Sequence, residues 1–225
     1  MEFVARIKSS KQIFDLTDKE LAKKEGIYNP KANYGLFVAC VGYGDVIKGL
    51  DEFLEGKEVD KWYRLEINQE NGFGKRLANL IKLIPLSRFK EEKFTPFPGL
   101  EITVDGIIGV VKTVGGGRVI VDFNHPLAGK DLIYEFRVNR IFTDDLEKLK
   151  AFMKTHFNLG DLKMELKDNK AKIEFNLPKE VGNSISKEIR NRIPIIKEVS
   201  FEKSSKWSLQ FENSILRTNI FIYFS

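Results

Sequence analysis

Imidazole and thiol groups are the side chains best suited to acid–base and nucleophilic chemistry near neutral pH. They occur at only three positions of this sequence, Cys40, His125 and His156. His125 stands directly before Pro126 in a turn-like segment, which favours a hydrogen-bonded structural role over that of a base or a metal ligand. His156 falls near the end of a predicted helix, where we expect a surface position or a contact with the last carbonyl groups. Cys40 falls in an apolar run and is expected to be buried and inert. These residues therefore predict neither a nucleophile nor a metal site.

The segment around His125 has a clear structural interpretation. Residues 121–130 read Val-Asp-Phe-Asn-His-Pro-Leu-Ala-Gly-Lys and stand between two apolar, strand-like runs, residues 118–123 and 132–138. Asn, Pro and Gly are typical of turns because they adopt the backbone angles that turns need. The pattern therefore predicts a tight connection between paired strands.

Three parts of the chain differ in their periodicity. In the first part, the predicted strands and helices are strands 3–7, 36–41 and 62–67, helix 18–24 with Thr17 as its N-terminal cap, and helix 46–54. In the middle part, residues 76–82 have a polar helical pattern and residues 84–86 are extended, and β-like runs follow at residues 100–104, 107–114, 118–123 and 132–141. In the last part, an α-β-β-α-β-β order predicts a compact α/β unit, with helices 144–157 and 184–193 and strands 162–166, 171–177, 198–203, 207–211 and 216–224.

The composition indicates one large domain or two to three small ones. The chain has 225 residues, of which 42% are hydrophobic and 31% are charged, so it can bury a core and keep an ionic surface. The net charge of +5 is mild and does not require a nucleic-acid partner. A single cysteine allows no internal disulfide framework, and no apolar run has the length of a signal-peptide core or a membrane helix. We therefore expect a cytoplasmic protein.

Three blocks of sequence accompany the segment 121–130. They are Ile-Phe-Asp-Leu-Thr at residues 13–17, Gly-Tyr-Gly-Asp-Val-Ile-Lys-Gly-Leu-Asp-Glu-Phe-Leu-Glu-Gly at 42–56, and Gly-Phe-Gly-Lys at 72–75. In this order the chain resembles the FKBP-type peptidyl-prolyl cis-trans isomerases, which carry Val-Phe-Asp-Thr-Ser/Thr, Gly-x-Gly-x-Val-Ile-x-Gly-x-Glu-x-x-Leu-x-Gly and Ala-Tyr/Phe-Gly at these places. Residues 20–30 and 82–87 further resemble the long archaeal FKBPs, which have an extra C-terminal domain.

The resemblance implies an α+β fold with three domains. We expect an FKBP half-barrel, an antiparallel sheet wrapped on a helix, at residues 1–76 and 122–142. A small β-rich domain inserted in the flap, similar to the chaperone domain of SlyD, is expected at residues 77–121, and a C-terminal α/β domain at residues 143–225. The segment 121–130 would then be the return of the chain from the insert into the half-barrel.

Prolyl isomerisation, the activity that the resemblance implies, needs neither a nucleophile nor a cofactor, and we expect no cofactor. The barrier is rotation about a partial double bond, roughly 20 kcal/mol. Because twisting destroys the amide resonance, the transition state is less polar than either planar isomer. A dry aromatic pocket therefore binds the transition state more tightly than the ground state.

Residue-by-residue correspondence with the family implies a pocket with aromatic walls, a floor at Leu50, a backbone donor at Ile47 N–H and a carboxylate at Asp15. The full expected set is Phe14, Asp15, Phe37, Val46, Ile47, Leu50, Phe73 and Tyr134. By periodicity alone, the apolar members would be read as ordinary core.

One position departs from the family. FKBPs usually carry a tyrosine and a hairpin before Val-Phe-Asp, and the tyrosine contributes a hydroxyl to the pocket. Here the stretch is residues 6–15, the tyrosine position falls on Ile7 or Lys8, and the hairpin is shortened. Two hypotheses follow: an isomerase with built-in chaperone activity, or a binding-only chaperone (a holdase) with a degenerate, weakly active pocket.

Other surfaces point to polypeptide partners. The apolar residues of the expected insert form a candidate groove for unfolded chains, and its members are Phe89, Phe94, Phe97, Leu100, Ile107 and Ile108; a small Phe-rich core is the alternative for each of them. The apolar residues 220–224 suggest a homodimer through the C-terminal domain. A basic cluster at Lys187, Arg190, Arg192 and Lys197 is interleaved with Glu188 and Glu198, so a solvated helix face is favoured over a nucleic-acid site.

Overall fold

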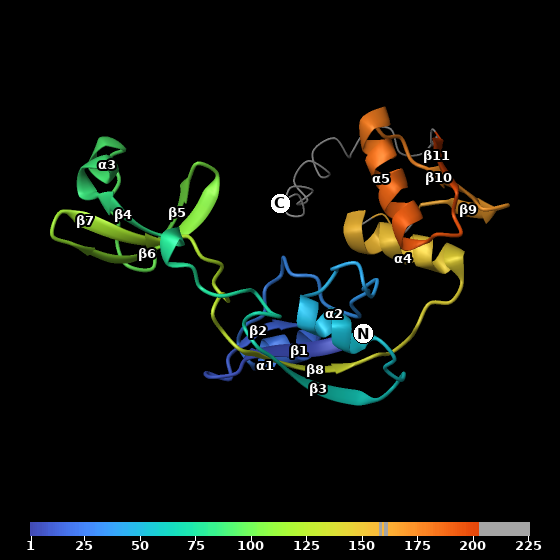
Figure 1. Cartoon of the computed structure of the whole chain (residues 1–225), viewed down its shortest axis with the longest axis horizontal. Coiled ribbons are helices and arrows are strands. Elements are labelled where there is room, and N and C mark those ends of the chain that lie inside the picture. The colour runs from blue at the N-terminus through green and yellow to red at the C-terminus, as the bar shows by residue number, and fades with distance from the viewer. Residues whose placement is uncertain (158, 160–161, 203–225) are drawn as a thin grey trace.

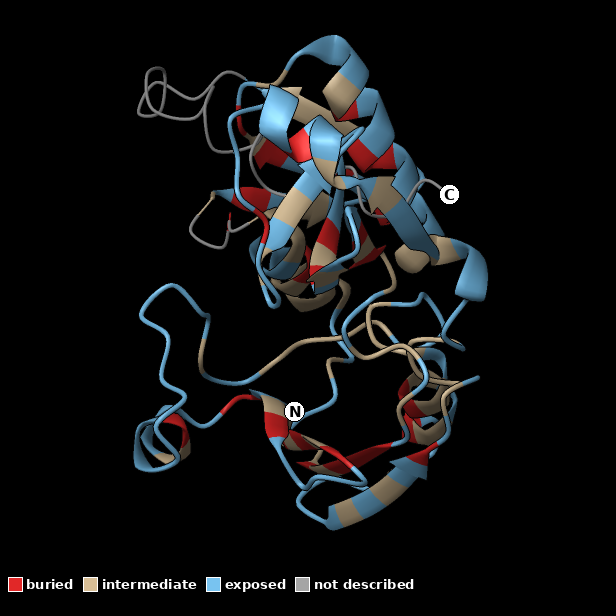
Figure 2. Cartoon of the chain, turned by 90° about the vertical axis from the view of Figure 1, so that its left-hand side faces the viewer, coloured by how far each residue is buried: buried red, intermediate tan, exposed pale blue. Residues whose placement is uncertain are grey.

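A computed structural model describes residues 1–157, 159 and 162–202. Its strands form three separate sheets, and each sheet has its own cluster of buried residues. Figure 1 shows the three parts side by side, with the N-terminal sheet between the other two. In Figure 2, exposed and intermediate residues alternate along one strand of the N-terminal sheet, as expected for a strand with one face toward a core.

The N-terminal sheet is fully antiparallel and curls around a helix. It contains β1 (Glu2–Ile7), β2 (Ile13–Leu16), β3 (Trp62–Ile67) and β8 (Leu132–Arg137), in the order β2-β1-β8-β3. The helix α2 (Lys48–Leu54) buries Leu50 and Leu54 in the core of this sheet, and the short helix α1 (Lys19–Lys24) follows β2. The predicted sheet wrapped on a helix is therefore confirmed.

The middle sheet has the order β4-β7-β6-β5 and is also antiparallel. Its elements are η1 (Ala78–Leu80), β4 (Ile81–Pro85), α3 (Leu86–Glu91), β5 (Glu101–Val104), β6 (Ile107–Gly115) and β7 (Arg118–Asp122). Its core contains Phe89, Val111, Val119 and Val121. Two chain segments connect this part to the N-terminal sheet (Figure 1).

The last part is a three-stranded sheet with two helices. Its elements are α4 (Asp145–Phe157), β9 (Met164–Lys167), β10 (Lys170–Glu174), α5 (Lys179–Arg192) and β11 (Glu198–Glu202), with the strand order β11-β10-β9. The strands β10 and β11 are parallel and α5 connects them. The predicted strands 207–211 and 216–224 lie outside the described residues.

The connection between the N-terminal and middle sheets is a polar cross-link of the two chain segments. Asn124 accepts a hydrogen bond from Leu77 N–H (2.8 Å) and donates one to Leu77 C=O (3.0 Å). Asp122 accepts two hydrogen bonds from Asn124 and pairs with the Arg76 guanidinium. Asp122 is buried at the end of β7. Because a buried charge is costly unless it is paired and hydrogen-bonded, these partners stabilise the ionised carboxylate.

Two predictions for the N-terminal part are wrong. The cap of α1 is Asp18, whose carboxylate accepts the N–H groups of Glu20 and Leu21. Thr17 is instead buried, where its hydroxyl accepts Phe3 N–H at 2.8 Å. Residues 36–41 do not form a strand. Cys40 N–H donates to the Asp45 side chain at 2.8 Å, so a local side chain takes a donor that a strand would use.

Two predictions for the middle part also need correction. Residues 76–82 are not a helix, since only the single turn η1 and the start of β4 lie there. Helix α3 was not predicted, because the presence of Pro85 led to the expectation of an extended backbone at residues 84–86. In the structure Pro85 is the residue before the helix, and proline restricts only its own φ and the residue before it.

The cross-link predicts a pH-dependent stability. Burial alone would raise the pKa of Asp122, but the hydrogen bonds from Asn124 and the Arg76 charge outweigh it and hold the pKa below its ordinary value. A folded-state pKa below the unfolded value of about 3.9 stabilises the fold above that value and loses this contribution as the pH falls through the folded-state pKa. We expect Asp122→Asn to lower the free energy of unfolding by about 1–3 kcal/mol near pH 7, and the deficit to shrink near pH 3. Urea unfolding of both proteins at both pH values measures it, and an equal deficit at both would contradict the account; Glu101→Gln on an exposed strand position is the control.

Candidate functional site

The N-terminal sheet gathers the apolar residues that the sequence singled out. The structure places them in the cluster of side chains around the buried core of β1, β8 and α2, and the members are Phe14, Phe37, Val46, Ile47, Leu50, Phe73 and Tyr134. Leu50 and Tyr134 are buried, and the other five are partly exposed at the edge of this cluster. A partly exposed apolar surface on a buried base is the form that a binding site for an apolar group takes.

The Phe14 ring contacts two of the other rings directly. Phe14 meets Phe73 edge-to-face with ring centroids 6.3 Å apart, and it meets Tyr134 in the same manner at 6.0 Å. We call Phe14, Phe73 and Tyr134 the aromatic site. Phe37 is one step removed, because its ring packs on Phe3 at 6.1 Å, and Phe3 in turn contacts Tyr134 at 5.8 Å.

A β-bulge brings two consecutive residues to this site. Ala5 pairs with Asp15 and Arg6 pairs with Ile13, so Phe14 is an extra residue in β2 with no partner on β1. In a regular strand, side chains alternate between the two faces of the sheet, and Phe14 and Asp15 would point in opposite directions. The bulge changes the direction of a side chain locally, and the Phe14 ring joins the same cluster as the Tyr134 ring.

Asp15 and Tyr134 lie in one row across the sheet. Ala5 pairs with Asp15 on one side and with Tyr134 on the other, so the three side chains share a face. Ala5 is small and fully buried. Burial, and to a smaller extent the charge of Asp15, raises the pKa of the Tyr134 hydroxyl far above its ordinary value. Asp15 as a whole residue is exposed, yet desolvation of its carboxylate raises its pKa, and a hydrogen bond from Leu16 N–H opposes this shift.

Neither residue expected at the position of the family's tyrosine lies in the row of Asp15. The ammonium group of Lys8 pairs with Glu66 at 2.7 Å. Ile7 is buried and pairs with Leu132, two pairs along the strand from the row of Asp15. The residue opposite Asp15 is Ala5. Only the strand register shows which residue lies opposite Asp15.

Phe73 is held by the chain segment that returns to the sheet. Gly129 N–H donates to Gly74 C=O at 2.8 Å, and the His125 ring stacks on the Phe73 ring with centroids 4.4 Å apart. His125 Nδ1 accepts the Leu127 N–H at 3.1 Å, and burial lowers the pKa of its imidazole. His125 is therefore a neutral ring that supports Phe73, as the turn predicted.

Val46 and Ile47 stand at the start of α2. The C=O of Ile47 accepts the N–H groups of Leu50 and Asp51. Among the described residues, its N–H group has no hydrogen-bond partner. The preceding loop is fixed by Asp51, whose carboxylate accepts Gly42 N–H at 3.0 Å.

Sequence patterns missed a polar cluster beside this loop. The Asp45 carboxylate lies 3.3 Å from His156 Nε2 and 3.2 Å from Arg192 Nη2. His156 was expected at the surface or at helix carbonyls, and Arg192 was assigned to a solvated basic face. The sequence contains only part of the information needed to find this cluster. Arg192 ends a helix whose pattern is amphipathic, but nothing in the sequence pairs Arg192 with Asp45, which is 147 residues away.

An apolar cavity of about 870 Å³ lies beside this cluster. On one side its lining includes residues 36–41, with Cys40 half-buried among them, and on the other it includes Phe152 and Ile193 of the last part. Burial raises the pKa of the Cys40 thiol, which keeps it protonated and unreactive at neutral pH.

Of the residues expected to bind unfolded chains, some pack in the core of the middle sheet and others are exposed. Phe89 is buried in the core of the middle sheet, and Leu100 packs against this core. The expectation of an open groove is therefore wrong for Phe89, because α3 turns it inward. The exposed members are Phe94, Phe97, Ile107 and Ile108.

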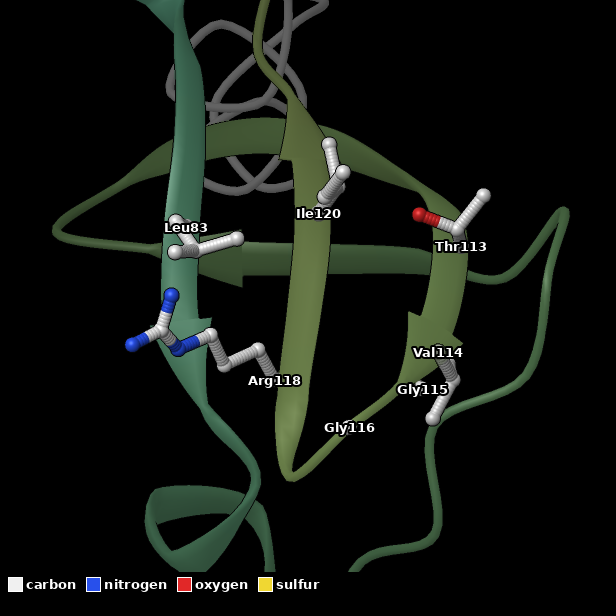
Figure 3. Close-up of a pocket in the computed structure, with 7 residues that line it drawn as sticks. All are labelled: Leu83, Thr113, Val114, Gly115, Gly116, Arg118 and Ile120. Atoms are coloured by element: carbon white, nitrogen blue, oxygen red, sulfur yellow. The ribbon is translucent and has the colours of Figure 1, made fainter.

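The open face of the middle sheet carries further apolar groups. Leu83, Ile120 and Thr113 pair across β4, β7 and β6, and Figure 3 shows their side chains around a shallow hollow that Arg118 borders. The hollow has a volume of about 440 Å³. Leu83 is exposed, although it was not among the expected residues.

The described part of the chain contains no group of three or more His, Cys, Asp or Glu residues that could hold a metal ion. None of its helices is both long and apolar enough to cross a membrane.

Comparisons with known proteins agree on one family. The chain is 35% identical over 130 residues to a short-type peptidyl-prolyl cis-trans isomerase of Methanocaldococcus jannaschii, covering 58% of this chain and 83% of that protein. It is 32% identical over 103 residues to a probable FKBP-type 16 kDa peptidyl-prolyl cis-trans isomerase of Pseudomonas fluorescens, covering 44% and 67%. It is 31% identical over 101 residues to the FKBP-type peptidyl-prolyl cis-trans isomerase SlyD of Haemophilus influenzae, of which it spans about half the length, 53%. A family model described as the FKBP26 IF domain matches residues 82–127.

Asp15 predicts a second pH effect, opposite in sign to that of Asp122. Its folded-state pKa is raised, so the ionised form costs stability above that pKa and the cost disappears as the pH falls below the unfolded value of about 3.9. Asp15→Asn should therefore have a higher melting temperature than the natural protein at pH 7, and the difference should vanish near pH 3. Differential scanning calorimetry at both pH values measures the difference. A variant that melts lower at pH 7 would contradict this account.

Proposed function

Since the chain belongs to the FKBP-type peptidyl-prolyl cis-trans isomerases and is an isomerase of this kind, we propose that it twists Xaa-Pro bonds at the aromatic site formed by Phe14, Phe73 and Tyr134. Proline-containing polypeptides are its substrates. The single observation that carries the assignment of the site is the β-bulge at Phe14, which brings this ring to Phe73 and Tyr134 beside Asp15.

The chemistry fits an apolar site. A proline ring seated against three aromatic rings is shielded from water, and the twisted amide, which is less polar than the planar one, gains from that environment. The buried side chain of Leu50 forms the base. The partly exposed Phe37, Val46 and Ile47 extend the apolar surface around it.

Two polar groups orient the substrate. The Ile47 N–H, which has no partner among the described residues, donates a hydrogen bond to a substrate carbonyl. Asp15 lies beside the twisted bond, and its raised pKa is typical of a functional group held in a costly environment. The Tyr134 hydroxyl, whose pKa is raised by burial and by the charge of Asp15, lies on the same face of the sheet as this carboxylate.

We further propose chaperone activity through the middle sheet. Phe97, Ile107 and Ile108 expose large apolar side chains there, and Ile108 is 63% exposed. Strand β5 is at the edge of this sheet, so it can pair with an extended client chain. We assign this role to an insert-in-flap domain at residues 77–121, supported by its separate sheet and core.

The last part of the chain is proposed as a separate α/β domain at residues 143–225, supported by its own core. Dimerisation through it stays a prediction, because the apolar residues 220–224 lie outside the described residues. Nucleic acid is not the proposed partner, since Arg192 of the basic cluster is largely buried against Asp45 and Glu188.

Removal of the Phe14 ring should impair catalysis. We expect Phe14→Ala to lower kcat/KM for a short Xaa-Pro peptide by roughly tenfold or more, which corresponds to about 1.4 kcal/mol of transition-state stabilisation. Tyr134→Phe should give a smaller loss, because it keeps the ring and removes only the hydroxyl. A coupled-protease or NMR exchange assay measures both.

The control for this experiment is Phe53→Ala. Phe53 packs in the same cluster but contacts Tyr63 and Phe136, away from Phe14 and Phe73. If Phe53→Ala and Phe14→Ala lose the same activity, the loss reports on general packing and the assignment of the aromatic site fails.

The chaperone proposal is tested separately. We expect the triple variant Phe97→Ser, Ile107→Ser and Ile108→Ser to lose most of its ability to suppress aggregation of a denatured protein, while the turnover of a short peptide stays unchanged. Ile195→Ser, at an exposed position of the last part, is the matched control. Full suppression of aggregation by the triple variant would exclude this surface as the client site.

A further inference from the structure

The loop before α2 is held from outside the N-terminal sheet by a residue that the isomerase chemistry does not use. Arg192 ends helix α5, in the last part of the chain. Its Nη2 donates to Asp45 Oδ1 at 3.2 Å and its Nη1 pairs with Glu188. The Asp45 side chain is only 5% exposed and that of Arg192 only 13%, so this is a shielded ion pair rather than a surface contact.

The contact is built from several groups, not from one pair. The Arg192 guanidinium is close to two rings, with its central carbon 5.4 Å from the centroid of Tyr43 and 5.3 Å from that of Phe152. The Tyr43 hydroxyl donates to the Asn191 C=O at 2.6 Å. Arginine suits such a contact better than lysine, because its planar guanidinium presents several donors in a fixed geometry as well as a flat face.

Asp45 connects this contact to the proposed substrate site. Its other carboxylate oxygen accepts Cys40 N–H at 2.8 Å and lies 3.3 Å from His156 Nε2. Burial alone would raise the pKa of Asp45, but the hydrogen bonds from His156 and Cys40 outweigh it and lower the pKa, so the carboxylate is charged at neutral pH. Asp45 is two residues before Ile47, whose N–H is the proposed donor to the substrate.

We propose that Arg192 is a positioning residue of the isomerase: it holds Asp45 so that residues 45–47 present Val46 and the Ile47 N–H in the geometry that the substrate needs. The inference rests on the proposed function of the aromatic site. It gives the last part of the chain a role in catalysis. The loop itself contains Gly42 and Gly44 at positive φ values of 84° and 71°. Because a glycine backbone can adopt many conformations, a contact from outside the loop is needed to hold one of them.

The test compares variants of the full chain in the peptide assay. Arg192→Met keeps the length of the side chain and removes the charge and the planar fork, and it should lower kcat/KM on the order of tenfold, mainly through kcat. Arg192→Lys should recover only part of the activity. Arg190→Met is the matched control, since Arg190 is exposed on the same helix and should leave the activity unchanged.

A double-mutant comparison separates positioning from folding. If Arg192 acts through Asp45, then Asp45→Asn should cause a similar loss, and the two changes together should cost little more than either one. The amide resonance of Ile47 should shift in Arg192→Met, while far-UV circular dichroism stays the same. Arg192→Met with the activity of Arg190→Met, or additive losses in the double variant, would overturn the inference. If Phe14→Ala lowers the activity and Arg192→Met does not, then this inference alone fails; if neither does, the proposed site itself is wrong.

Discussion

The site depends on a single extra residue in strand β2. Without the bulge at Phe14, regular alternation would send either Phe14 or Asp15 to the other face of the sheet. With it, the Phe14 ring contacts Phe73 and Tyr134 while Asp15 stays opposite Ala5. Ala5 is equally necessary. Only a small side chain in the middle of the row leaves space for the charge of Asp15 to act on the Tyr134 hydroxyl. Strand β1 pairs with β2 on one side and with β8 on the other. This pairing fixes the positions of Ala5, Asp15 and Tyr134.

The site draws on segments that are far apart in the sequence, and each is held by polar contacts. The loop with Phe73 is fixed by Gly129 and His125 of the returning segment. Asp122 and Asn124 join the two segments that lead to the middle sheet. The loop before Ile47 is anchored by Asp51 from α2 and, through Asp45, by Arg192. The aromatic rings form the apolar surface, and these contacts fix the positions of the loops around it.

Periodicity reached most of the strands and the helix, because it is a local signal, whereas the sheet wrapped on the helix and the aromatic residues of the site were implied by the family resemblance of the Gly-rich blocks. It failed where a side chain overrides the local pattern. Residues 36–41 look like a strand, yet Cys40 N–H bonds to Asp45; Thr17 looks like a cap, yet it is buried against Phe3 and Asp18 caps the helix. The register of β1 could not be read from the sequence, so the pairing of Ala5 with Asp15 was not predicted. Arg192 was beyond reach for another reason: its partner is 147 residues away, and no local pattern records such a pair.

The central claim is that a prolyl bond is bound against Phe14, Phe73 and Tyr134. Titration of the isotope-labelled full chain with a short Xaa-Pro peptide, followed by NMR, tests it most directly. The account predicts saturable shifts of the Ile47 amide and of the ring resonances of these three residues, with peptide exchange faster than in free solution. Shifts confined to β4–β7, with the three rings unchanged, would contradict it.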